Sequence, residues 1–238
     1  MATPTPGDAE RRTQIGRTKT GILLLLIGAL ISWLPTIGLI GLVCTAIGAI
    51  LVILGHPAFG PVHRRNVIAS ILLFVVGGAI AVGGGAIALG LGAAAITTAP
   101  NEFELAAVLQ DIFTNIVLFA AIGAFVSGLA SVFFTYALQE RQGQLVLWAA
   151  YAAMVIVQFA TLLVGLPALA VIARSLAHTK FTSGGTVDVV AISAAISGAV
   201  TLVQWFAVIP AILYALANYF AWTRIKKGVI PGPVTLPA

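Results

Sequence analysis

The fold class of this chain is decided by residues 67–98, which read VIASILLFVVGGAIAVGGGAIALGLGAAAITT. The run holds no charged residue and no proline, and glycine or alanine recurs every few positions. An α-helix rises about 1.5 Å per residue, so about 20 apolar residues cover a hydrocarbon core about 30 Å thick. Small residues allow the backbones of membrane helices to approach closely. The run therefore predicts a tightly packed transmembrane helix.

The composition of the whole chain agrees with this run. Of 238 residues, 60% are hydrophobic and 8% are charged, whereas about a quarter of the residues of soluble domains are charged. The sequence predicts an all-α, polytopic integral membrane protein of the cell membrane, with the lipid bilayer as its first partner. Lys and Arg form no dense basic stripe with interleaved aromatic residues, so we expect no nucleic-acid partner.

Five further apolar runs accompany residues 67–98, which gives six predicted spans. The expected spans are residues 20–34, 36–55, 67–98, 105–138, 145–172 and 189–222. Only Pro35 separates the first two, so they are either two short spans or a hairpin that enters the membrane and returns. We expect residues 20–228 to form the transmembrane domain. Residues 1–19 are expected to be a disordered basic arm, and residues 229–238 a disordered Pro-rich tail.

Lys and Arg fall almost entirely on one predicted side of the membrane. The other side carries only Arg174 and Lys180. Because short cytoplasmic segments are enriched in Lys and Arg, we expect both termini to be cytoplasmic. The cytoplasmic residues are Arg11, Arg12, Arg17, Lys19, Arg64, Arg65, Arg141, Arg224, Lys226 and Lys227.

Small residues recur at four-residue spacing in three of the runs and predict helix-packing faces. Residues 67–98 offer Gly77, Ala81 and Gly85 on one stripe, and Ala86, Gly90 and Ala94 on another. The later runs offer Gly123, Ser127 and Ser131, and Ser193, Ser197 and Thr201. We expect a tight bundle without a wide pore.

The segment GHPAFGPVHRRN, residues 55–66, is the most polar internal stretch near the first spans. His56 and His63 have no cysteine or carboxylate in the segment to complete a zinc site, which needs three or four ligands, so we expect no metal there. Arg64 and Arg65 are instead expected to fix the topology and to contact anionic lipid headgroups.

Asp111 is the ionisable residue inside a predicted span and is therefore a candidate functional residue. Asn115 follows it at i+4, on the same helix face. Arg174 lies at comparable depth in the next run. Asp111 and Arg174, together with Asn115, are expected either to lock two helix ends as an ion pair or to form a proton or cation site.

Two glutamines and two prolines form the other polar constellation. Gln158 and Gln204 have similar predicted depths and could bond across a helix interface. Pro167 and Pro210 are expected to kink the same two helices and to free backbone carbonyls. In transporters, broken helices of this kind frame the substrate site.

The opening KTGILLLLIGALISWLPTIGLIGLVCTAIGAILVILG, residues 19–55, resembles archaeal multi-span membrane proteins of unknown function that begin with a Gly- and Leu-rich hairpin broken by proline. The resemblance implies no activity, cofactor or site residue.

Two functions from different classes follow from these patterns. The first is a non-catalytic accessory or scaffold subunit that packs through its small-residue faces against other membrane proteins or a second copy. The second is a small transporter or channel for ions or small solutes that uses the polar residues of the fourth to sixth runs. No motif of a catalytic, cofactor or metal site stands out in the sequence, so we expect neither an enzyme nor a bound cofactor.

Overall fold

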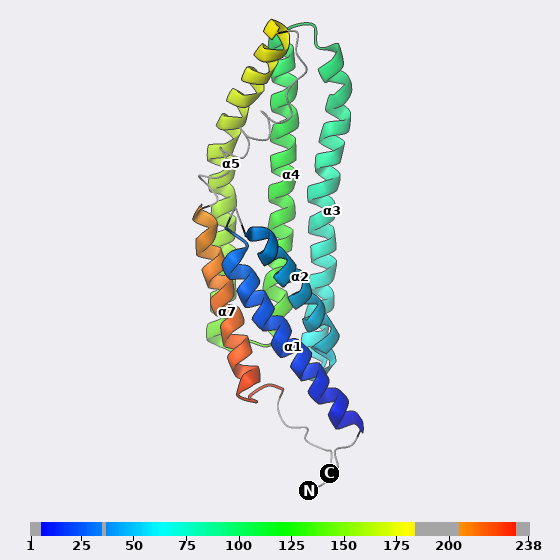
Figure 1. Cartoon of the computed structure of the whole chain (residues 1–238), viewed down its shortest axis with the longest axis vertical. Coiled ribbons are helices and arrows are strands. Elements are labelled where there is room, and N and C mark those ends of the chain that lie inside the picture. The colour runs from blue at the N-terminus through cyan, green and yellow to red at the C-terminus, as the bar shows by residue number, and fades with distance from the viewer. Residues whose placement is uncertain (1–5, 35–36, 184–204, 232–238) are drawn as a thin grey trace. The chain divides into compact units, whose positions relative to one another are not determined.

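The computed structural model describes residues 6–34, 37–183 and 205–231, and every regular element in these ranges is a helix (Figure 1). The α-helices are α1 (Pro6–Ile31), α2 (Gly38–Gly55), α3 (Gly60–Thr98), α4 (Glu102–Tyr136), α5 (Arg141–Ser183) and α7 (Val208–Lys226). Two short 3₁₀ helices, η1 (His56–Phe59) and η2 (Trp205–Ala207), precede α3 and α7.

Five helical stretches in the described chain are long and apolar enough to cross a membrane. One of them, Gly38–Thr98, joins α2, η1 and α3 into 61 continuous residues. The prediction of an all-helical fold with helices long and apolar enough to span a membrane is confirmed for the described residues, whereas the count of six spans stays a prediction. Ser193, Ser197 and Thr201 lie outside the described residues.

The chain forms two compact units, and α3, α4 and α5 contribute residues to both. Unit 1 consists of residues 1–72, 129–154 and 207–238, and unit 2 of residues 73–128 and 155–206. In unit 1, α1 packs against α2, η1 and α7.

Helix α1 begins earlier than the sequence pattern indicated. Residues 6–19, expected to be disordered, are helical from Pro6 onward. Proline suits the first helical position, Asp8 lies in the first turn, where the helix dipole favours an acidic residue, and the Gln14 amide donates to Glu10 over one turn, at 3.1 Å. The basic segment is therefore a helical extension of α1. At the other end of the chain, residues 232–238 lie outside the described ranges.

The α1–α2 hairpin is built on glycines spaced seven residues apart. A Cβ added at Gly21 would lie 2.6 Å from the carbonyl oxygen of Gly48, and one added at Gly48 would lie 2.7 Å from that of Gly21. Seven residues further along α1, a Cβ added at Gly28 would lie 2.8 Å from the carbonyl oxygen of Gly41. Two turns of helix separate residues seven apart, so these glycines share one face of each helix. The helix backbones touch directly along this seam.

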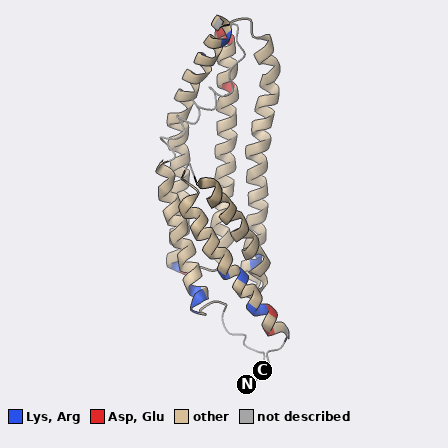
Figure 2. Cartoon of the chain, viewed as in Figure 1, with Lys and Arg blue, Asp and Glu red and all other residues tan. Residues whose placement is uncertain are grey.

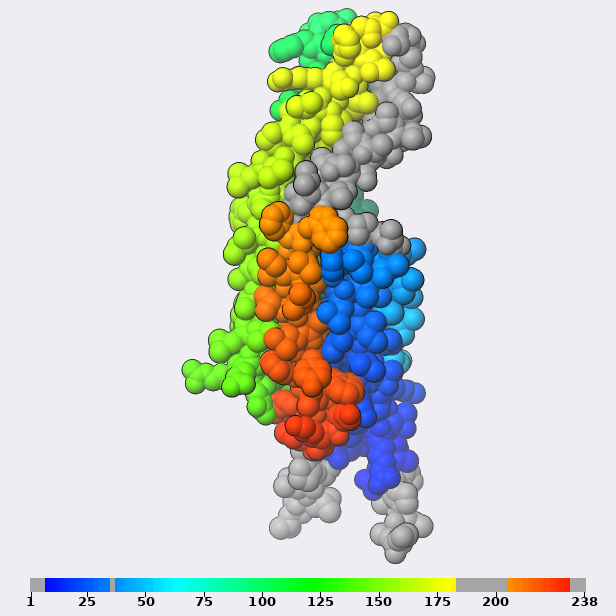
Figure 3. Space-filling model, turned by 60° about the vertical axis from the view of Figure 1, so that its left-hand side comes forward, coloured from blue at the N-terminus to red at the C-terminus, as the bar shows by residue number. Residues whose placement is uncertain are grey.

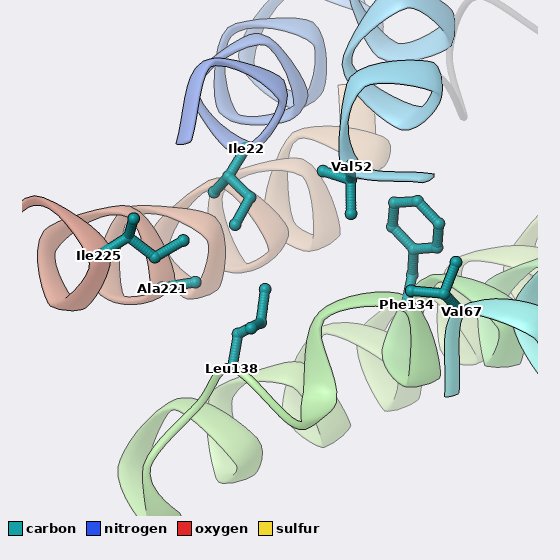
Figure 4. Close-up of a cluster of buried hydrophobic side chains, with 7 residues drawn as sticks. All are labelled: Ile22, Val52, Val67, Phe134, Leu138, Ala221 and Ile225. Carbon is teal, nitrogen blue, oxygen red and sulfur yellow. The ribbon is translucent and has the colours of Figure 1, made fainter. Parts of the chain in front are cut away.

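Beside the glycine seam, unit 1 contains a cluster of buried apolar side chains (Figure 4). Two members of this cluster lie next to the seam in the sequence: Ile22 follows Gly21, and Val52 lies one turn after Gly48. Both side chains are fully buried. The cluster also takes side chains from α3, α4 and α7, so five helices share one core. Its members are Ile22, Val52, Val67, Phe134, Leu138, Ala221 and Ile225.

Helix α7 lies beside α1 (Figure 3). Three polar contacts, named here the clamp, hold the turn between α4 and α5 against α7. The buried Gln139 side chain donates a hydrogen bond to the carbonyl oxygen of Ala217, at 2.8 Å. Arg224 Nη1 donates to the carbonyl oxygen of Leu138, at 2.8 Å, and its Nε lies 3.1 Å from Glu140 Oε1. The Leu138 carbonyl, left free beyond the end of α4, therefore gains a donor from a distant part of the sequence.

In unit 2, α3 and α4 touch through small residues, and the glycine face differs in part from the predicted stripe. A Cβ on Gly77 would lie 2.7 Å from the carbonyl oxygen of Gly123, and one on Gly123 would lie 2.8 Å from Ala81 Cβ. A Cβ added at Gly85, expected on the same stripe, would meet no described neighbouring atom within 4 Å, whereas one added at Gly84 would meet Phe119. A four-residue step turns about 400°, so a strict four-residue stripe drifts about 40° per step away from a straight neighbour.

Adjacent glycines in α3 give a matched test of this contact. Gly77→Ala should lower stability by about 1–3 kcal/mol, because its methyl group collides with the α4 backbone. Gly78→Ala should be neutral or raise stability by up to about 1 kcal/mol. A Cβ added at Gly78 would meet no described neighbouring atom within 4 Å, and alanine is the better helix former. Unfolding by SDS titration in mild detergent, followed by circular dichroism, measures both. Equal effects of the two changes would contradict the described α3–α4 contact.

Candidate functional site

The most polar constellation in unit 2 surrounds the first turn of α4. Asn101 caps this helix, since its Oδ1 accepts the backbone N–H of Glu104, at 2.9 Å, and its amide donates to the Glu104 carboxylate, at 3.3 Å. Glu102 Oε1 lies 3.0 Å from Nδ1 of His178 on α5. The ammonium group of Lys180 donates to the carbonyl oxygen of Ile96 at the end of α3, at 3.0 Å. Polar contacts thus tie the end of α5 to both neighbouring helices.

An apolar seam holds α4 against α5 beside these contacts. Leu105 and Leu109, one turn apart on α4, are buried against Ala173 and Ala177, one turn apart on α5. Alanine on one side and leucine on the other allow the two helices to come close. This packing fixes the rotation of α4 about its own axis, and so determines which α4 residues lie beside the seam.

Next to the seam lies a pocket of about 460 Å³. Arg174 reaches it from α5, while α4 supplies an acid, an amide and an apolar stretch. The α4 residues are Glu102, Phe103, Ala106, Ala107 and Gln110. The pocket therefore offers one carboxylate, one guanidinium group, one amide and an apolar floor, a set that can bind but that contains no nucleophile paired with a base.

The predicted pair of Asp111 with Arg174 is not formed among the described residues. Asp111 and Asn115 are both exposed, and neither lines the pocket. The reason is helix phase: buried Leu105, Leu109 and Ile112 define the packed face of α4, and Asp111 falls on another face. Arg174 faces Glu102 and Gln110 across the pocket instead.

The glutamine and proline constellation is only partly described. Gln158 lies half-buried in α5, and Gln204 lies outside the described residues. Pro167 lies inside α5, which continues past it as a helix. Pro210 does not interrupt α7, because it is buried in the first turn, directly after η2. Backbone N–H groups of the first turn form no hydrogen bond within the helix, so the N–H that proline lacks is not needed there.

The histidines of residues 55–66 are separated by the helix boundary. His56 Nδ1 donates to the carbonyl oxygen of Ile53, while His63 is buried in the first turns of α3 with its ring edge-on to Phe59. Gly60, between them, has a φ of 87°, a left-handed conformation that favours glycine. No group of three His, Cys, Asp or Glu in the described ranges is placed to hold a metal ion.

Arg64 and Arg65 are exposed on the first turns of α3, within the basic end of unit 1. Within this unit, Lys and Arg gather where α1 and α3 begin and where α7 ends (Figure 2). Lys226 lies over the Trp222 ring, 4.8 Å from its centroid, and Trp222 stacks on Tyr219. A basic rim with aromatic residues beside it is typical of a membrane–water boundary.

Sequence reasoning missed Glu102, Gln110 and His178 as members of a common site. The Asn101–Glu104 capping pattern was a usable signal, because it fixes the first turn of α4 and hence its phase. Comparison with family models, curated proteins and solved structures finds no match to this chain.

Proposed function

We propose that this chain is a non-catalytic membrane protein that works by assembly, as an accessory or scaffold subunit. The single observation that carries the proposal is the second small-residue face of α3. It consists of Ala79, Gly83, Ala86, Gly90 and Ala93, and it is named here the open face.

The open face lies roughly opposite the face that α4 covers, at about 100° of rotation per residue. Steps of three and four residues separate the members of the covered face, as they do in the open face. The covered face consists of Gly77, Ala81, Gly84, Ala88 and Gly92. Gly83 and Gly90 have no atom of the described chain within 4 Å, and Ala79, Ala86 and Ala93 are exposed. In lipid, close packing replaces the hydrophobic effect as the force between helices, so a second smooth face suits a helix of a partner protein.

The proposed topology is six spans in the cell membrane with both termini in the cytoplasm. The distribution of Lys and Arg along the sequence supports it, since only Arg174 and Lys180 fall on the other side. The helical extension of α1 then projects its arginines into the cytoplasm. Each Lys or Arg near an anionic leaflet adds about 1 kcal/mol of attraction, which would hold this orientation.

Bulk on the open face tests the proposal. Gly90→Leu should reduce the mass of the particle purified in mild detergent, measured by light scattering, because the side chain holds a partner helix away. Gly85→Leu is the matched control: it adds the same bulk to the same helix away from the open face, at a position where an added Cβ would also meet no described atom within 4 Å.

We expect the wild type and Gly85→Leu to share one mass above that of the 24.5 kDa chain, after correction for detergent, and Gly90→Leu to fall below it. A wild-type particle with the mass of one chain would refute assembly. An identical response of the two variants would refute the open face as the interface.

A further inference from the structure

The pocket between α4 and α5 brings opposite charges to one cavity. Its volume of about 460 Å³ falls within the range of small-molecule sites. Among the described residues that line it, Glu102 is the only acid and Arg174 the only base. Charged ligands that carry one sign would meet one attractive and one repulsive group, whereas a ligand that carries both signs could satisfy both.

Both charged groups have free bonding capacity toward the pocket. Glu102 contacts His178 through Oε1, and a carboxylate has a second oxygen and further lone pairs to accept donors. Arg174 is exposed and takes part in no ion pair within the described chain, and a guanidinium group presents a planar fork that matches a carboxylate. Gln110, on the same wall, adds an amide that can donate or accept.

Apolar side chains line the α4 wall of the pocket beside these polar groups. Ala106 and Ala107 lie between Glu102 and Gln110 along α4, so the wall between the polar ends is short and smooth. Phe103 is 84% exposed and also lines the pocket, where an aromatic face can attract an ammonium group. A ligand that carries both a carboxylate and an ammonium group would find a partner for each in this pocket.

We propose that the α4–α5 pocket binds a small zwitterion, with its carboxylate on Arg174 and its ammonium group on Glu102. This site is separate from the open face of α3, so a failure of one proposal leaves the other standing. An amino acid or a similar short aminocarboxylate is the class of ligand that fits.

The probes are glycine, β-alanine and γ-aminobutyrate, with propionate and propylamine as singly charged references. Isothermal titration calorimetry of the full chain in mild detergent measures their binding. At least one of the three zwitterions should bind more tightly than both references. Arg174→Gln and Glu102→Gln should each weaken that zwitterion about 10- to 100-fold, the range expected for loss of one hydrogen bond to a charged group.

Two further variants separate binding from folding. Asp111→Asn removes a carboxylate from an exposed position of the same helix that does not line the pocket, and should leave the affinity unchanged. Arg174→Lys keeps the charge and should recover part of the affinity. Absence of binding by all three zwitterions, equal binding of propionate, or affinity that survives both Arg174→Gln and Glu102→Gln would overturn the proposal.

Discussion

Gly48→Leu should abolish the folded α1–α2 hairpin, one of the largest effects expected of a single substitution in the described chain. The Cβ alone would lie 2.7 Å from the Gly21 carbonyl oxygen and 3.0 Å from the backbone nitrogen of Leu25. Backbone atoms cannot turn aside as a side chain does, so the whole helix has to move. We expect a loss above about 3 kcal/mol, beyond the usual range for overpacking.

The matched control is Gly16→Leu on α1, where no atom lies within 4 Å of the added carbon. This exposed site should accept leucine and gain up to about 1 kcal/mol, because leucine is a better helix former than glycine. SDS titration followed by circular dichroism again measures the difference. A folded Gly48→Leu protein as stable as Gly16→Leu would show that the two backbones are not in contact.

Arg224→Gln should cost about 1.5–3 kcal/mol, the second largest expected effect, because it removes a charged hydrogen bond from the Leu138 carbonyl. The ion pair with Glu140 adds little to this, since the Glu140 side chain is 67% exposed and water screens it. We expect the loosened turn to expose Leu138, which is only 2% exposed in the folded chain. Hydrogen exchange across residues 137–144 reports that loosening.

Two controls accompany this prediction. Lys227→Gln removes a charge three residues further on, at an exposed position outside the described contacts of the clamp, and should change stability by less than about 0.5 kcal/mol. Glu140→Gln should also have little effect, because the carbonyl bond remains. If Glu140→Gln is as harmful as Arg224→Gln, the ion pair and not the carbonyl bond holds the turn.

The sequence predicts the long apolar helices of the described chain well, because a lipid environment demands such helices and length and composition express that demand directly. The predicted run of residues 105–138 corresponds to α4, Glu102–Tyr136, and the run of residues 36–55 to α2, Gly38–Gly55. Residues 6–19 were misjudged because they are polar. Polarity limits burial in lipid, but it does not prevent residues from being helical.

Helix faces were harder to predict than helices. Gly77 and Ala81 were placed correctly, but Gly85 was not, because the contact with α4 continues through Gly84. The seven-residue spacing of Gly21 with Gly28, and of Gly41 with Gly48, was visible in the sequence and went unused. The pocket was beyond reach for another reason: the neighbour of Arg174 depends on the phase of α4 against α5, which packing decides.

Photo-cross-linking from the open face of α3 tests the proposed assembly most directly. Cys44 is the only cysteine, so a Cys44→Ser chain can carry a benzophenone label on a single new cysteine, at Gly90 or, as a control, at Gly85. Irradiation in the native membrane should attach a protein partner to the label at position 90, as a product heavier than the 24.5 kDa chain, and little or none to the label at position 85. Absence of a protein adduct at position 90, or equal adducts at both positions, would contradict assembly through this face.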